Sequence, residues 1–179
     1  MNKAMSGMCA TTLVAISVLL SGCAISSDGL VPEESVAVGR QIQKSVRVMP
    51  VDGGRASSFG REAYITNEKM HSAIVQALID SGLFVDVTTD GDADLNLFSE
   101  IITLSTEGGL SPLYAIVMQY WVEDARTGEE LWRDGVNTRH QVQWNDAFAG
   151  GTRIIMAVEG ATQKNLTALI EGLDSSDIR

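Results

Sequence analysis

The first 23 residues constrain this 179-residue chain more than any other feature, because they set how much of it is left to fold. Lys3 is followed by an apolar stretch, residues 10–20, and by two small residues that precede Cys23. A basic start, an apolar segment of about 7–15 residues and a small-residue cleavage site are typical of a secretory signal. We therefore expect residues 1–22 to be a signal peptide that is removed before the protein works.

The sequence Leu20-Ser21-Gly22-Cys23 resembles the bacterial lipobox, in which a branched apolar residue and two small residues precede a cysteine. The resemblance implies a diacylglycerol on the thiol of Cys23, cleavage before that residue, and acylation of its amine. Ala24 stands where an Asp would imply inner-membrane retention, so the resemblance implies the outer membrane and a periplasm-facing protein. Two or three acyl chains together make a stable anchor.

Two other interpretations of the apolar segment stay open. A transmembrane anchor would use the stretch between Lys3 and Asp28, which carries no charge. However, its strongly apolar part, residues 13–20, is too short to span about 30 Å of hydrocarbon. An ordinary cleaved signal would carry Cys23 by chance. If Cys23 is lipidated, no free thiol remains, because Cys9 leaves with the signal.

Composition excludes several classes of protein. The net charge of −10 disfavours nucleic-acid binding, which needs clusters of Lys and Arg against the phosphates. Two cysteines exclude a disulfide-dense scaffold, and no CxxC pair exists for a structural zinc site. The 45% hydrophobic fraction supports a packed core. We expect a membrane partner through the lipid and protein partners in the envelope, but no nucleic acid.

The mature chain divides into a tether and one domain. Residues 23–45 predict a lipidated N-terminus and a flexible tether, since they are small and polar, contain Pro32 and lack sustained periodicity. About 22 extended residues would reach roughly 70–80 Å. Residues 46–179 predict a single domain. Its patterns predict strands at residues 46–51, 83–87, 95–104, 114–124 and 130–144, and helices at residues 67–81 and 152–173.

The order β-α-β-β-β-β-α predicts a two-layer α+β domain, with a mixed, mostly antiparallel sheet and two helices on one face. The first long helix has the clearest ends, because Thr66 or Asn67 can cap its start and Gly82 can end it. The turn that begins at Asp124 has a hairpin composition, in which Gly128 is free to adopt a positive φ.

Four local motifs occur together in the predicted domain. They are the apolar-Pro pair Met49-Pro50, the helix end "L..sG.F.V" at residues 78–85, the strand start Ala93-Asp94-Leu95, and the hairpin "D..TGe..W" at residues 124–132. Together they resemble small periplasmic lipoprotein domains. These include the curli-secretion lipoprotein, the penicillin-binding-protein activator lipoproteins and the lipoprotein of Pel-type exopolysaccharide export. Auxiliary lipoproteins of lipid-transporting ABC systems show a similar pattern of motifs. The resemblance covers about residues 46–135 and implies a fold more than a function, because these motifs are strand ends and turns.

The sequence contains no motif that indicates catalysis, a cofactor or a metal. An EF-hand loop starting at Asp90 would need Gly and Glu where Leu95 and Ile101 stand, so a turn is favoured over a calcium site. The two histidines, His71 and His140, have no Cys or His at ligand spacing. Nucleophile-elbow, P-loop and dinucleotide fingerprints are also missing. We expect no catalytic, cofactor-binding or metal-binding residues.

Charge is distributed unevenly along the chain. Residues 70–125 contain nine acidic residues and no Lys or Arg, whereas residues 40–69 contain six basic and three acidic residues. One interpretation is a solvated acidic surface. The other is a head-to-tail homo-oligomer, in which the basic segment of one copy meets the acidic middle of the next. The candidate acidic surface comprises Asp86, Asp90, Asp92, Asp94, Glu100 and Glu123.

Three aromatic residues are candidate contacts with a partner or a membrane. Trp121 alternates with the apolar face of its predicted strand, so we expect it to point outward. Trp144 and Phe148 flank a short polar loop near the last helix. An exposed aromatic can enter the membrane interface or anchor a partner. The alternative is packing under the last helix, where Trp144 would share a strand face with Trp132.

These observations favour a non-enzymatic outer-membrane lipoprotein that serves as an accessory or assembly subunit of an export or wall-synthesis machine. An alternative is an auxiliary lipoprotein of an ABC-type lipid-transport system that binds lipid or tethers the transporter. A third is a glycan- or peptidoglycan-acting enzyme. Its best acid-base candidates would be His140, Asp124 and Glu100.

Overall fold

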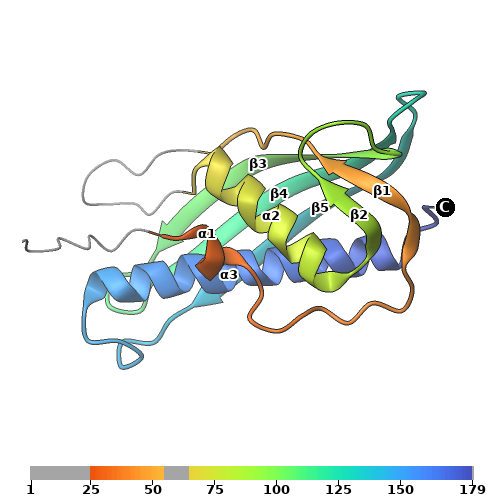
Figure 1. Cartoon of the computed structure of the whole chain (residues 1–179). Coiled ribbons are helices and arrows are strands. Elements are labelled where there is room, and N and C mark those ends of the chain that lie inside the picture. The colour runs from red at the N-terminus through yellow and green to blue at the C-terminus, as the bar shows by residue number, and fades with distance from the viewer. Residues whose placement is uncertain (1–24, 55–64, 179) are drawn as a thin grey trace, which may run out of the picture.

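The computed structural model describes residues 25–54 and 65–178 (Figure 1). The predicted signal, the lipobox and Cys23 lie outside these residues. The described elements are α1 (Ser27–Leu30), β1 (Ile42–Val48), α2 (Asn67–Ser81), β2 (Phe84–Thr88), β3 (Leu95–Glu107), β4 (Leu113–Asp124), β5 (Glu130–Gln141) and α3 (Gly150–Asp174).

The sheet has five strands in the order β2-β1-β3-β4-β5. Strand β1 runs parallel to β2 and β3, whereas β3, β4 and β5 form longer antiparallel ladders. Strands β2 and β5 are its edges, so the sheet is open. Helices α2 and α3 lie on one face of it (Figure 1). The predicted two-layer α+β fold with a mixed, mostly antiparallel sheet is confirmed.

Helix α2 has the predicted bounds because both of its ends are capped. The Thr66 side chain accepts a hydrogen bond from the Lys69 amide, and Gly82 ends the helix with a φ of 63°. Its buried face packs onto the sheet and consists of Met70, Ala73, Ile74, Ala77, Leu78 and Ser81. The capping chemistry, rather than helix propensity alone, therefore sets the length of this element.

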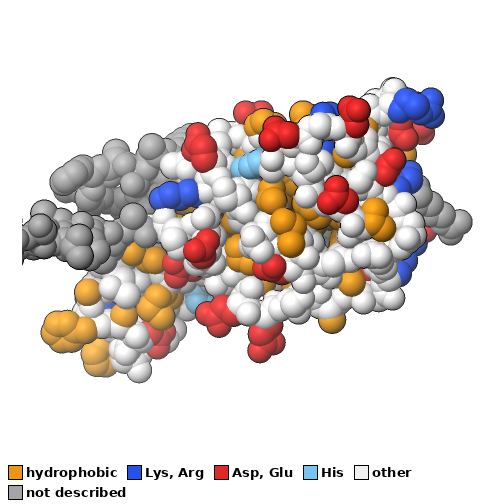
Figure 2. All heavy atoms as spheres, viewed as in Figure 1, with side chains coloured by type: hydrophobic (Ala, Val, Ile, Leu, Met, Phe, Trp, Pro, Cys, Tyr) orange, Lys and Arg blue, Asp and Glu red, His pale blue; other side chains and the backbone are white. Residues whose placement is uncertain are grey.

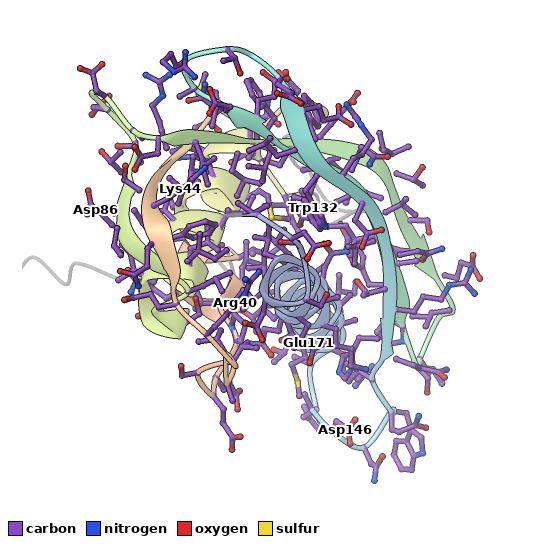
Figure 3. All side chains as sticks on the ribbon, turned by 90° about the vertical axis from the view of Figure 1, so that its right-hand side faces the viewer. Arg40, Lys44, Asp86, Trp132, Asp146 and Glu171 are labelled. Carbon is purple, nitrogen blue, oxygen red and sulfur yellow. The ribbon has the colours of Figure 1, made fainter. Side chains whose placement is uncertain are left out.

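Helix α3 packs against β4 and β5 around a buried polar pair. The Tyr120 hydroxyl donates to the Asn165 side-chain oxygen at 2.7 Å, and the Asn165 amide donates to the Val136 carbonyl at 3.2 Å. Burial raises the pKa of Tyr120 far above its usual value, so the hydroxyl remains a donor. Figure 3 shows α3 end-on beside the curved sheet, with Trp132 of β5 turned toward it.

The prediction of a flexible tether is wrong for residues 25–45. Ile25 and Leu30 are buried, and α1 contacts both α2 and α3. The Lys69 ammonium donates to the Ile25 carbonyl at 2.6 Å, and Asp174 accepts from the Gly39 amide at 2.9 Å. A segment without periodicity can bury isolated apolar side chains, because each one fills a separate gap between elements that are already folded.

Several element boundaries also differ from the predictions. Strand β1 begins at Ile42 rather than at residue 46, and it ends before Pro50, which lacks the amide hydrogen that a central strand needs. Strand β5 ends at Gln141, so Trp144 does not belong to it. Helix α3 begins at Gly150, two residues earlier than predicted.

Candidate functional site

Three exposed apolar side chains gather at one end of the molecule, which we call the aromatic end: Leu110, Trp144 and Phe148. Their exposed fractions are 74%, 68% and 106%, respectively. Figure 2 shows hydrophobic side chains projecting at the lower left, where the loop of residues 142–149 joins β5 to α3 in Figure 1. Packing under the last helix is therefore wrong for Trp144 and Phe148. Clusters of exposed apolar side chains mark surfaces that meet another molecule or a membrane.

The loop of residues 142–149 is held from its inner side. Val142 is buried, and its amide donates to the Pro112 carbonyl at 3.0 Å. Arg153 of α3 donates from Nη1 to the carbonyls of Trp144 and Phe148, both at 3.3 Å, and to that of Ala147. These bonds fix the backbone while the aromatic rings face outward.

An open hollow of about 450 Å³ lies at the aromatic end. Most of its lining is apolar, and its polar members are Asn145 and Arg153. A hollow of this size can take a short stretch of acyl chain or an apolar side chain of a partner. The lining residues are Leu110, Trp144, Asn145, Ala147, Phe148 and Arg153.

Trp121 points away from the helices, as predicted, but it does not join the aromatic end. Its ring stacks on Phe98 with a centroid distance of 5.1 Å, and the Arg133 guanidinium lies 4.9 Å from its centroid. Phe98 and Arg133 come from the strands on either side of β4, so they cover opposite faces of the indole. The indole nitrogen donates to Glu123 at 3.0 Å. Trp121 is thus part of a closed stack on the sheet rather than a free contact.

The predicted acidic residues do not form one continuous site. Asp94 accepts hydrogen bonds from the Ser45 amide and hydroxyl, both at 2.8 Å, and these bonds lower its pKa. Glu123 is occupied by Trp121. The remaining four are exposed and are spread over β2, the turn after it and β3: Asp86, Asp90, Asp92 and Glu100. No cluster within the described residues has the composition of a metal site.

Several cations of the basic segment have intramolecular partners. Arg47 donates to Asn96 at 3.0 Å, Lys69 donates to the Ile25 carbonyl, and Arg40 donates to the Ser176 carbonyl near the C-terminal end of α3 (Figure 3). Arg55 and Arg61 lie outside the described residues. These contacts leave fewer cations for the acidic surface of a second copy than the sequence alone indicates.

The three acid-base candidates are not brought together. Asp124 is a turn residue that accepts from the Thr127 amide at 2.8 Å, and His140 lies ten positions away along the β4–β5 ladder. Ten strand residues correspond to roughly 33 Å. Glu100 pairs with Gln119 in the middle of β3. The His140 ring packs against Gly160 of α3, and burial, followed by the nearby charge of Lys164, lowers its pKa.

Two residues that line the hollow at the aromatic end, Leu110 and Arg153, are not among the contacts predicted from the sequence. Leu110 lies in the turn between β3 and β4. It follows two glycines and belongs to no periodic apolar pattern, so the sequence does not mark it as a contact residue. Arg153 falls within the predicted last helix, and the sequence pattern does not reveal that this residue is only 8% exposed. An arginine that follows Gly150-Gly151 near the predicted start of an apolar helix is the signal that could have identified it.

No family model matches the chain, and no curated protein matches it. Solved structures do resemble it. A Xanthomonas campestris protein of family DUF330 has a TM-score of 0.58 and 13% identity over 79% of this chain and 88% of its own. A hypothetical protein from Chlamydia trachomatis has a TM-score of 0.58 and 11% identity, covering 75% and 97%.

The PelC dodecamer from Paraburkholderia phytofirmans is also similar, with a TM-score of 0.50 and 10% identity over 77% of this chain and 92% of its own. At these identities the likeness shows a shared fold. Along the part of the chain that the structure describes, every helix is too short or too polar to cross a bilayer.

Proposed function

We propose that this protein is a lipid-anchored accessory subunit of a cell-envelope export or wall-synthesis machine. It is attached to the outer membrane through Cys23, faces the periplasm and has no catalytic activity of its own. The observation that carries the proposal is the burial of a residue close to Cys23. Ile25 is buried in the domain and stands two residues after Cys23. Two extended residues span about 7 Å, so the domain stays against the membrane surface.

The aromatic end fits this placement. The Gly29 carbonyl in α1 accepts from Gln163 of α3 at 3.0 Å, and α1 lies in the same half of the molecule as the loop of residues 142–149 (Figure 1). A lipid at Cys23 therefore brings Trp144 and Phe148 close to the bilayer. Aromatic rings favour the interface between headgroups and acyl chains. The anchor and the exposed rings then form two contacts with one surface.

An accessory role is supported by the fold that the chain shares with the PelC dodecamer and by the two open edges of its sheet. Open edges and exposed carboxylates leave room for protein partners or for a head-to-tail oligomer. Sedimentation of the detergent-solubilised protein at low and high salt tests self-assembly. A salt-sensitive oligomer supports charge-driven assembly, and a monomer at every concentration contradicts it.

Substitution of the anchor tests the proposed function. In cells fed labelled palmitate, Cys23→Ala is expected to abolish labelling and to release the protein from the outer-membrane fraction. Cys9→Ala is the matched control, because it removes the other cysteine of the chain within the predicted signal. Labelling that persists in Cys23→Ala, or a wild type that takes up no label, contradicts the proposal.

A second candidate function is that of an auxiliary lipoprotein in lipid transport. The apolar hollow at the aromatic end favours it. Native mass spectrometry of the purified protein distinguishes the two functions. A whole phospholipid that remains bound in the absence of a bilayer, and is lost in Trp144→Ser, supports lipid transport. Bound lipid limited to the covalent anchor supports the accessory role.

A further inference from the structure

The N-terminal end of α3 carries positive charge that no described side chain neutralises. Ala149 is its N-cap residue and supplies no side-chain hydrogen bond, and the first turn contains no acidic residue. The first amide groups of a helix lack carbonyl partners and carry the positive end of the helix dipole. A Cβ added at Gly151 would meet no described atom within 4 Å, so this end is open to a ligand.

Arg153 adds a second, independent positive group at the same place. Its side chain is 8% exposed, and its Nε is buried without a hydrogen-bond partner among the described residues. Nη1 serves the loop carbonyls, whereas Nη2 would lie 3.7 Å from a Cβ added at Gly150. Arg153 forms no ion pair with a described carboxylate. A guanidinium whose partners are neutral carbonyls, and whose Nε is buried without a partner, is stabilised when an anion joins it.

The surroundings of this positive site are apolar rather than acidic. Arg153 lines the hollow together with Leu110, Trp144 and Phe148. The acidic side chain of the loop, Asp146, accepts a hydrogen bond from the Gln143 amide of the same loop at 2.7 Å. A positive centre within exposed rings matches the layer of a bilayer where phosphates meet acyl chains.

We propose that Arg153 and the first amides of α3 bind the phosphate of a phospholipid headgroup while Trp144 and Phe148 enter the membrane. The inference deepens the proposed function and rests on its placement of the domain against a bilayer. Arg153 then has two tasks. Nη1 holds the backbone of the loop, and Nη2, beside the open helix end, meets the phosphate. The lipid is chosen over free phosphate because three exposed apolar side chains surround the site.

The test uses the lipidated protein, purified from membranes and reconstituted into vesicles of phosphatidylethanolamine and phosphatidylglycerol with brominated acyl chains. Bromine quenches indoles that reach the acyl region, and Trp144→Phe identifies the contribution of Trp144. Gly151→Glu places a carboxylate at the open helix end, where it competes with a phosphate. Gly151→Gln is the uncharged control of the same size.

We expect Trp144 to be quenched in the wild type and in Gly151→Gln. Gly151→Glu is expected to shift the equilibrium between inserted and non-inserted Trp144 about fivefold toward the non-inserted state. Its melting temperature should not fall, because an acid suits a helix start and glycine is a poor helix former. An unquenched Trp144, or an equal loss in both variants, overturns the inference.

A lipid without phosphate separates the headgroup from the acyl chains. Brominated galactolipid vesicles are expected to quench Trp144 less and to remove the difference between the Glu and Gln variants. Equal quenching in both lipids overturns the phosphate site, and competition by inorganic phosphate would assign it to a soluble anion instead. These outcomes are independent of palmitate labelling at Cys23, so the inference can fail while the proposed anchor stands.

Discussion

The two ends of the β4–β5 pair are built in opposite ways. At the hairpin end, residues 124–130, the Asp124 side chain accepts from the amides of Arg126 and Thr127 at 3.1 and 2.8 Å. Gly128 completes the turn with a φ of 71°. The turn therefore satisfies its own polar groups and displays charged residues to solvent. Its sequence is explained by folding alone.

At the aromatic end, the polar groups of the loop are satisfied from another element. Arg153 reaches from α3 to the loop carbonyls, and Trp144 and Phe148 remain outside the core. Folding explains Arg153 in part, but it does not explain exposed rings that bury little surface. The difference teaches that a loop can expose side chains that folding does not require, and these are the side chains that the proposed membrane contact uses.

Loss of Arg153 should have the largest effect on stability. Arg153→Met keeps the length of the side chain but removes the donor to three loop carbonyls, which should lower the free energy of unfolding by about 2 kcal/mol. Urea unfolding of the purified protein measures it. Arg139→Met is the control, because Arg139 is exposed on β5. Equal unfolding free energies for the two variants would show that the loop is not held by Arg153.

A substitution at the hairpin end should cost less. Gly128→Val forces a β-branched residue into a left-handed conformation, so we expect a loss of about 1–2 kcal/mol in unfolding free energy. Gly109→Val is the matched control. Gly109 lies in the turn near Leu110, has no positive φ, and a Cβ added there would meet nothing within 4 Å. If Gly109→Val is the more damaging change, the hairpin is not the more constrained of the two turns.

The fold could be predicted where local chemistry decided it. Helix α2 has a cap at Thr66 and a left-handed Gly82, and both signals are contained within its own sequence. Strands β3 and β4 are long enough for alternation to be visible. Such elements carry their own boundaries, so one chain is sufficient to place them.

The rest depends on contacts between distant residues. Ile25 and Leu30 are buried in a segment that contacts both α2 and α3, and no local sequence pattern records those contacts. The apolar–polar alternation of β5 continues in the sequence as far as Trp144, but the strand itself ends at Gln141. Arg153 is a site residue only because the fold brings the start of α3 beside the loop of residues 142–149. These contacts arise from tertiary packing, which periodicity does not report.

Acid should loosen the hairpin end at low pH. The Thr127 amide and hydroxyl, followed by the Arg126 amide, lower the pKa of Asp124 below its ordinary value of 3.8. A lowered pKa means that its contribution is present above pH 3.8 and is lost as the pH falls further. Asp124→Asn should therefore show a shallower loss of stability in acid, measured as the urea midpoint against pH. Asp92→Asn is the control, because it removes the same charge from a residue without a turn hydrogen bond. An equally shallow loss of stability in Asp92→Asn would contradict the assignment of the effect to Asp124.

The opposite end should respond nearer to neutrality, and more weakly. Burial against α3 lowers the pKa of His140 below its ordinary value of 6.5. The unfolded chain then takes up a proton first, so stability is present above pH 6.5 and declines as the pH falls below it. His140→Gln should flatten this part of the profile. His71→Gln is the control from α2. If this control flattens the profile and His140→Gln does not, the prediction for His140 is contradicted.

The smallest effect on stability is expected from the two exposed aromatic rings. Trp144→Ser with Phe148→Ser should change the unfolding free energy by less than about 0.5 kcal/mol, because neither ring is buried. Val142→Ser, at a residue 1% exposed in the same loop, should cost about 2 kcal/mol. If the double variant leaves urea unfolding intact but ends quenching by brominated lipids, the rings serve the membrane contact. A loss of stability as large as that of Val142→Ser would place them in the core and remove the contrast between the two ends.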